Sequence, residues 1–128
     1  MQPLEDLEDR LSRAWSPVRH LNSVMNTEAL REAYNACLPK LSEYTTELAQ
    51  NEDLYRAVQA VRERDDFTRL PAAKRKAVDN ALRDFRLGGV ALDPEKKARF
   101  KAISQELSAL SAKFEENLLD ATNAWSKH

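Results

Sequence analysis

Apolar residues recur at spacings of three and four along almost the whole chain, and this pattern constrains the fold more than any other feature. The first run comprises Leu4, Leu7, Leu11, Ala14, Val18, Leu21 and Met25. Such spacing places the side chains on one face of an α-helix. Signals for strands and hairpins are weak, because the only two glycines in the sequence are adjacent, at Gly88 and Gly89. The sequence therefore predicts an all-α protein.

Local start and stop signals divide this pattern into about five helices. The expected starts are Pro3 for the first helix, Asn26 as cap of the second, Asn51 as cap of the third, Pro71 for the fourth, and Asp93 with Pro94 for the fifth. The first helix continues to about Met25, and Gly88 is expected to end the fourth as a left-handed C-cap. The segment RERDDFTRL between the third and fourth helices is typical of a charged loop.

Two prolines lie inside the first two apolar stripes. Because both stripes keep their phase across Pro17 and Pro39, we expect bends at these positions rather than helix ends. The fifth helix, from Pro94 to Trp125, would be about 48 Å long at 1.5 Å per residue. We therefore predict an elongated antiparallel bundle in which the far half of the fifth helix, Phe114 to Trp125, projects past its shorter neighbours.

Length and charge limit the classes of function. The 128 residues suit a single helical domain, and 20 Lys and Arg against 21 Asp and Glu give a formal charge of −1 with the signs interspersed. This balance disfavours binding to nucleic acid or to an anionic membrane. The N-terminus has no signal-peptide pattern, no apolar run could span a bilayer, and the lone Cys37 cannot form an internal disulfide. We expect a cytoplasmic location.

Candidate metal ligands and nucleophiles are few. His20, Cys37 and His128 lie far apart in the sequence, and no H-E-x-x-H motif is present, so we expect no metal site in this chain. A Cys–His pair formed in space stays open. Cys37, however, lies on an apolar stripe, which favours a buried, inert thiol. For His20 the simplest interpretation is a partly buried, hydrogen-bonded side chain at the bend near Pro17.

The remaining charged and aromatic residues favour structural roles. Asp79 is expected to pair with Arg75 and Arg83 on one helix surface. A basic run is interrupted by acidic residues and contains Phe67 as its one aromatic, which leaves nucleic-acid binding as a minor alternative. This run comprises Arg62, Arg64, Arg69, Lys74, Arg75 and Lys76. Trp15 and Trp125 lie near core faces and are interpreted as packing or interface anchors. No catalytic, cofactor-binding or metal-binding residue is assigned.

Four stretches together resemble a known family. They are SPVRHLNSV, LREAYNACLPKLSEY, RKAVDNALRDFRLGG and ISQELSALSAKFEENLLDAT. In this order they are similar to the N-terminal helical region of bacterial oligopeptidase A, which belongs with thimet oligopeptidase and neurolysin among the zinc metallopeptidases. The resemblance covers nearly the whole chain, and the pattern LSxLSxxFxxNxLDAT is distinctive.

The resemblance implies a role without a catalytic residue. Family members are several times longer, and their zinc-binding H-E-x-x-H lies in a later part, so zinc is expected there and this chain alone should be inactive. The resemblance implies that residues 1–128 are a fragment that forms one wall of a channel admitting short peptides. The expected partner is the rest of the parent chain, and self-association through the fifth helix is a further expectation. Whether His20 or Arg19 lines the channel stays open. The alternative is a free-standing helical module that binds a partner helix.

Overall fold

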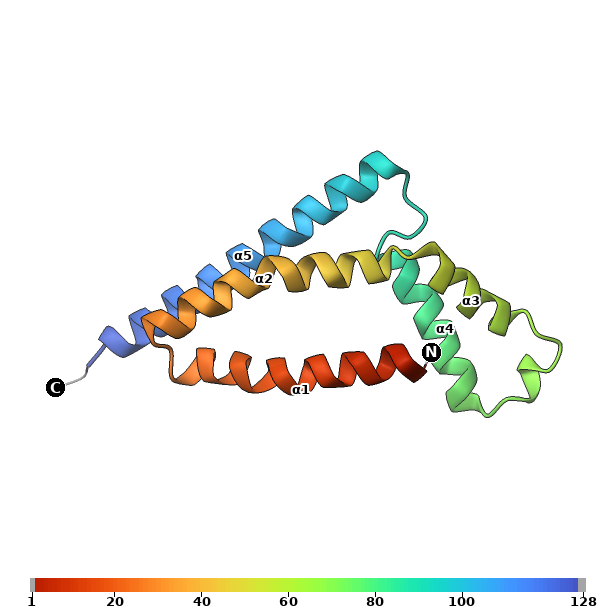
Figure 1. Cartoon of the computed structure of the whole chain (residues 1–128), viewed down its shortest axis with the longest axis horizontal. Coiled ribbons are helices and arrows are strands. Elements are labelled where there is room, and N and C mark those ends of the chain that lie inside the picture. The colour runs from red at the N-terminus through yellow and green to blue at the C-terminus, as the bar shows by residue number, and fades with distance from the viewer. Residues whose placement is uncertain (1, 127–128) are drawn as a thin grey trace. The chain divides into compact units, whose positions relative to one another are not determined.

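The computed structural model describes residues 2–126 and contains only helices and connecting turns over that range. Their bounds are Gln2–Val24 for α1, Glu28–Ala49 for α2, Glu52–Arg62 for α3, Phe67–Arg69 for the short 3-10 helix η1, Ala72–Leu87 for α4 and Pro94–Ala124 for α5 (Figure 1). The prediction of an all-α fold with five α-helices, the last of them the longest, is confirmed. None of the helices within the described residues is long and apolar enough to cross a membrane.

Helix starts follow the local capping signals. The Oδ1 atoms of Asn51 and Asp93 each accept a hydrogen bond from the backbone N–H three residues later, at 3.0 and 2.9 Å, as predicted for these two caps. The start of α2 differs by one residue from the prediction. Thr27 caps it through a 3.3 Å bond from the Leu30 N–H, whereas Asn26, the predicted cap, bonds to other side chains.

The two glycines end α4. Gly88 has φ −73°, an ordinary right-handed value, whereas Gly89 has φ +89°, where a side chain would be strained. Backbone N–H groups of Gly89 and Val90 donate to the carbonyls of Arg86 and Phe85, both at 3.1 Å, which is the Schellman arrangement. The predicted left-handed residue, Gly88, is therefore wrong by one position, and Gly89 takes that conformation.

Both internal prolines lie within continuous helices. Pro17 is inside α1 and Pro39 is inside α2, so neither residue ends its helix. The prediction that the helices continue through them is confirmed. The size of each bend stays a prediction.

The chain divides into two compact units. One unit comprises residues up to Lys40 together with those from Leu107 onward, and the other comprises Leu41 to Glu106. The boundary falls inside α2 and inside α5, so each unit contains a part of both helices. The assignment of residues 1–128 to a single domain stays a prediction.

The unit of residues 41–106 has an apolar core. Its buried members are Val58, Phe67, Leu82 and Val90. The segment expected to be a charged loop supplies one of them, because η1 turns the Phe67 ring inward. The Arg62 guanidinium lies 4.4 Å from the centre of that ring, and its Nε donates to Asp79 at 2.9 Å.

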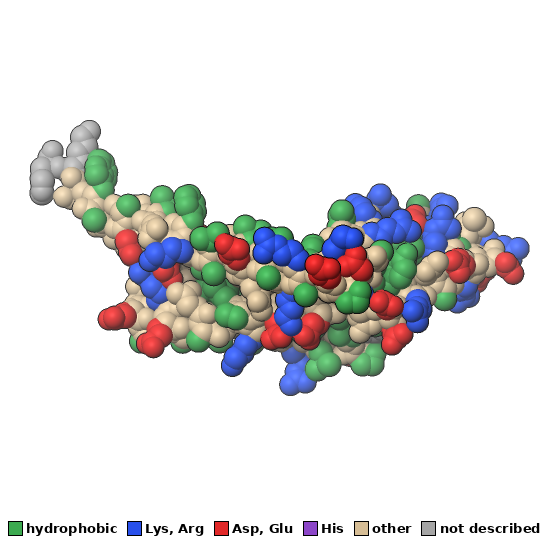
Figure 2. Space-filling model, turned by 90° about the horizontal axis from the view of Figure 1, so that it is seen from above, with side chains coloured by type: hydrophobic (Ala, Val, Ile, Leu, Met, Phe, Trp, Pro, Cys, Tyr) green, Lys and Arg blue, Asp and Glu red, His purple; other side chains and the backbone are tan. Residues whose placement is uncertain are grey.

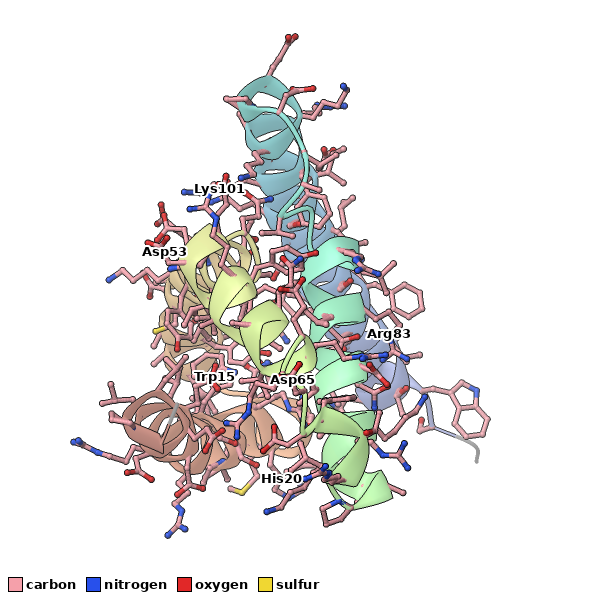
Figure 3. All side chains as sticks on the ribbon, turned by 90° about the vertical axis from the view of Figure 1, so that its right-hand side faces the viewer. Trp15, His20, Asp53, Asp65, Arg83 and Lys101 are labelled. Atoms are coloured by element: carbon pink, nitrogen blue, oxygen red, sulfur yellow. The ribbon has the colours of Figure 1, made fainter. Side chains whose placement is uncertain are left out.

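Ion pairs in this unit differ from the predicted ones. Asp79 pairs with Arg62 of α3 rather than with Arg75 or Arg83, because α3 and α4 pack side by side. Arg83 instead contacts its neighbour Asp84. Lys101 of α5 reaches two carboxylates of α2, Glu43 at 2.6 Å and Glu47 at 3.2 Å (Figure 3). Lys97 likewise bonds Glu52 of α3, at 2.8 Å, so ion pairs link α5 to both α2 and α3 in this unit.

The unit of residues 1–40 and 107–128 has a more polar interior. Tyr34 is its buried aromatic residue and stacks on Trp15 of α1, with the ring centres 4.9 Å apart. Among the described residues of this unit, the other buried side chains are Asn22 and Glu116. Trp15 therefore packs as predicted, but polar groups occupy positions that apolar side chains would fill in an ordinary helix bundle.

Candidate functional site

A polar hollow of about 450 Å³ lies between α1 and α5 in the unit of residues 1–40 and 107–128. Four lining residues, Ser16, Arg19, His20 and Ser23, come from one face of α1, since their spacings are three, one and three. Glu115 of α5 completes the lining. The hollow brings together a guanidinium, an imidazole, a carboxylate and two hydroxyls.

The charges of two lining residues, Arg19 and Glu115, act on the phenol of Tyr34. Burial raises the pKa of its phenol, the negative charge of Glu115 raises the pKa further, and the positive charge of Arg19 lowers it. These groups can donate and accept hydrogen bonds to a peptide-like ligand, but they include no paired nucleophile and base.

His20 and Cys37 are both exposed, in contrast to the predictions. His20 lies on α1 beside the hollow, and the predicted partial burial is wrong (Figure 3). Cys37 is on the surface of α2, because Tyr34 and not Cys37 is directed inward on that part of the helix. His128 lies outside the described residues. Among residues 2–126, no three His, Cys, Asp or Glu side chains come together to hold a metal ion.

A second feature is an apolar surface along the C-terminal part of α5. It comprises Leu107, Leu110, Phe114, Leu118 and Trp125, which we call the outer face, and these side chains are 58–72% exposed. Figure 2 shows hydrophobic side chains along the upper left edge of the molecule, where α5 runs toward the C-terminus. The sequence analysis expected the far half of this helix, Phe114 to Trp125, to project past its neighbours, and the exposure of Phe114, Leu118 and Trp125 agrees with that expectation. The opposite side of the helix, which carries Glu116, faces α2.

The inward side of α5 is anchored by polar contacts to α2. Glu116 is only 6% exposed and accepts a 2.6 Å hydrogen bond from the Asn35 amide. One turn further on, Asp120 accepts two bonds from the Arg31 guanidinium, at 2.7 and 3.0 Å. We call Arg31, Asn35, Glu116 and Asp120 the inner seam. Its pairs run in opposite directions along α2 and α5, so the two helices are antiparallel here.

The inner seam continues toward the turn between α1 and α2. Asn26 accepts a 2.8 Å bond from Arg31 Nε and donates to Asn22, both to its carbonyl at 2.9 Å and to its side chain at 3.0 Å. This explains why Asn26 does not cap α2. These contacts around Asn26 are local, whereas the Arg31–Asp120 and Asn35–Glu116 pairs join residues 89 and 81 positions apart, which no short-range signal could have revealed.

The structure thus defines a class of all-α chain, built from five α-helices and one short 3-10 helix over residues 2–126. A family model for the neurolysin/thimet oligopeptidase N-terminal domain matches residues 1–97, and the chain belongs to this family. Oligopeptidase A of Haemophilus influenzae is 50% identical over 125 residues, which is 98% of this chain and 18% of that protein. Oligopeptidase A of Escherichia coli is 50% identical over 126 residues, again 98% of this chain and 18% of the relative.

Similarity extends to plants. A probable cytosolic oligopeptidase A of Arabidopsis thaliana is 38% identical over 127 residues, 99% of this chain and 18% of that protein. The chain therefore spans less than a fifth of the length of these relatives. The matched region includes nearly all of this chain. The resemblance seen in the sequence is confirmed.

Proposed function

We propose that this chain is the N-terminal helical segment of an oligopeptidase A-like metallopeptidase and forms one wall of the channel that admits short peptides. Support comes from the match to oligopeptidase A over 98% of the chain but only 18% of the relative. Zinc and the catalytic residues belong to the part of the parent outside this segment. A cytoplasmic location of the parent is part of this proposal, and the names of two plant relatives include both a cytosolic and an organellar protein.

The observation that carries the proposal is the exposed outer face of α5. A row of large apolar side chains on a small protein normally marks a surface that another structure covers. The inward side of the same helix is already occupied by α2. The segment therefore has the properties of a part whose packing is completed by a neighbour.

The polar hollow gives the segment a means of contacting peptides. In the proposed parent, Arg19 and Glu115 offer opposite charges to a zwitterionic peptide, and Ser16 and Ser23 offer hydroxyls to its backbone. His20 would line the channel with them rather than pack in the core. None of these groups cleaves the peptide.

A chimera tests the proposal. The matched 126 residues of E. coli oligopeptidase A are replaced by those of this chain, and peptide cleavage is compared with that of the unmodified enzyme. We expect the chimera to cleave short peptides and the isolated chain to cleave none. A soluble, folded chimera without peptidase activity would contradict the proposal.

The second candidate is a free-standing module that binds a partner helix through the outer face. The same exposed side chains favour it, since an apolar helical stripe is a common docking surface. The free-standing module and the peptidase segment differ in one measurable respect. A free module would bind its partner without any connection to a peptidase, and its fusion into the chimera would not support cleavage.

A further inference from the structure

Helix α5 has an apolar side and a polar side, and the two point in nearly opposite directions. Phe114 and Glu116 are two residues apart and therefore point about 200° apart around the helix axis. The apolar side chain is exposed, whereas the carboxylate is buried against α2. An amphipathic helix left to itself buries its apolar side. Something must hold α5 in the reverse orientation.

The inner seam supplies that constraint. Rotating α5 to bury Phe114 would expose Glu116, break its 2.6 Å bond to Asn35, and separate Asp120 from Arg31. Several orientations of a helix can bury similar amounts of apolar surface. Buried polar pairs favour the one orientation in which their hydrogen bonds form, as buried polar residues do in helix bundles. The seam thus determines which side of α5 stays available to a partner.

The limits of the family model indicate what covers the outer face. That model ends at residue 97, only four residues into α5, whereas similarity to the oligopeptidase A relatives continues over 98% of the chain. Nearly all of α5 therefore lies beyond the residues that the family model matches. In the relatives, the corresponding residues adjoin the rest of a protein of which this chain covers 18%. The large part of the peptidase is the candidate occupant.

We propose that the outer face of α5 is the surface on which the remainder of the peptidase docks, and that the inner seam holds this face outward. This inference rests on the proposed function and adds to it the location and chemistry of the contact. The partner surface is apolar and belongs to the same polypeptide. The seam residues act as positioning residues, because they touch α2 and not the partner.

Thiol labelling tests the docking surface. In a Cys37→Ser background, Phe114→Cys is placed both in the isolated chain and in the chimera described above, and both are labelled at concentrations where the isolated chain is monomeric. We expect a maleimide to react about tenfold more slowly in the chimera, as it would if the thiol were open in one molecule of ten. Ala109→Cys is the matched control, since this exposed residue lies about 140° around the helix from residue 114. It should react at similar rates in both proteins.

Equal rates for Phe114→Cys in the two proteins would overturn the inference. A second measurement does not depend on labelling. At concentrations where the isolated chain is monomeric, Phe114→Ser with Leu118→Ser should lower the melting temperature of the chimera by several degrees and leave that of the isolated chain nearly unchanged. The reason is that these side chains are exposed in the monomer and covered in the chimera. Similar shifts in both proteins would also overturn it.

The seam is tested in the isolated chain at concentrations where it is monomeric. Replacing both Asn35 and Glu116 by leucine should let α5 rotate, so that Phe114→Cys becomes less reactive while helicity is retained. Glu106→Leu is the control, because it removes an exposed carboxylate of α5 outside the seam. Unchanged reactivity in the double variant would show that the seam does not set the orientation.

These results separate the two proposals. A chimera that protects residue 114 but cleaves no peptide would contradict the proposed function and leave the docking surface standing. A chimera that cleaves peptides while residue 114 stays fully reactive would support the proposed function and overturn the docking surface.

Discussion

The Asn35 amide donates a 2.6 Å hydrogen bond to Glu116, a carboxylate buried between α2 and α5 although 81 residues separate the two in sequence. This contact and the Arg31–Asp120 pair beside it turn the polar side of α5 inward. As a result, the apolar side is exposed along Leu107 to Trp125. The folded segment therefore presents an apolar surface on the side of α5 opposite α2.

The isolated chain is expected to hydrolyse no peptide and to hold no stoichiometric zinc. The described residues bring no metal-ligand group together, and the sequence contains no H-E-x-x-H. Metal analysis after dialysis and a peptide-cleavage assay check this. About one zinc per chain, or cleavage that a chelator abolishes, would contradict the prediction.

The isolated chain is also expected to self-associate through the outer face. Burying about 400 Å² of apolar surface at about 25 cal/mol per Å² provides about 10 kcal/mol before the costs of association. Leu118→Ser with Trp125→Ser should weaken the oligomer and leave helicity largely intact. Sedimentation over a range of concentrations measures the effect.

A chain that stays monomeric at high concentration would count against this prediction. Ala109→Ser, a small change at an exposed position, is the control and should leave the association constant unchanged.

Gly89→Ala should destabilise the unit of residues 41–106 by about 1–2 kcal/mol, because alanine is strained at a positive φ. The φ of Gly89 is +89°, and an added Cβ would lie 2.8 Å from Leu92 Cδ1. Gly89→Asn should cost less, since asparagine tolerates the left-handed region better. Chemical denaturation of the three proteins gives the comparison. Equal stability of the alanine variant and the unmodified chain would show that this turn is not strained.

Tyr34 should lose its proton at a higher pH in the folded chain than in the unfolded chain. Burial and the nearby Glu115 raise its pKa, so the folded state holds the proton more tightly. Stability should therefore fall as the pH rises above the pKa of an unfolded tyrosine, near 10. Phenolate absorbance of the chain and of Tyr34→Phe, recorded during an alkaline titration, isolates this group.

Glu115→Gln should bring the titration of Tyr34 to a lower pH, because it removes the second cause of the shift. A phenol that titrates at the same pH in folded and unfolded chains would contradict the burial of Tyr34.

The sequence predicted the helices because their ends depend on neighbouring residues. Asn51 and Asp93 cap α3 and α5 through bonds to backbone groups three residues away, and such signals are visible in a single window. Two of these predictions, the cap at Asn26 and the left-handed residue at Gly88, were each wrong by one residue. Asn26 is engaged by Arg31 instead, and the left-handed position falls on Gly89.

The orientation of the helices was not predictable in the same way. Apolar spacing correctly described the stripe on α5, but it could not show which side would meet α2. That choice depends on Asn35 and Glu116, and on Arg31 and Asp120, pairs formed only after folding. The positions of Cys37 and His20 depend equally on tertiary packing, which explains why both are exposed rather than buried.

Extending the reading frame beyond the codon for His128 tests the central claim most directly. The account predicts that the frame stays open and encodes a polypeptide several times longer than this segment, with an H-E-x-x-H motif in its later part. A stop codon directly after His128 in the native gene would contradict it, and would favour the free-standing helical module.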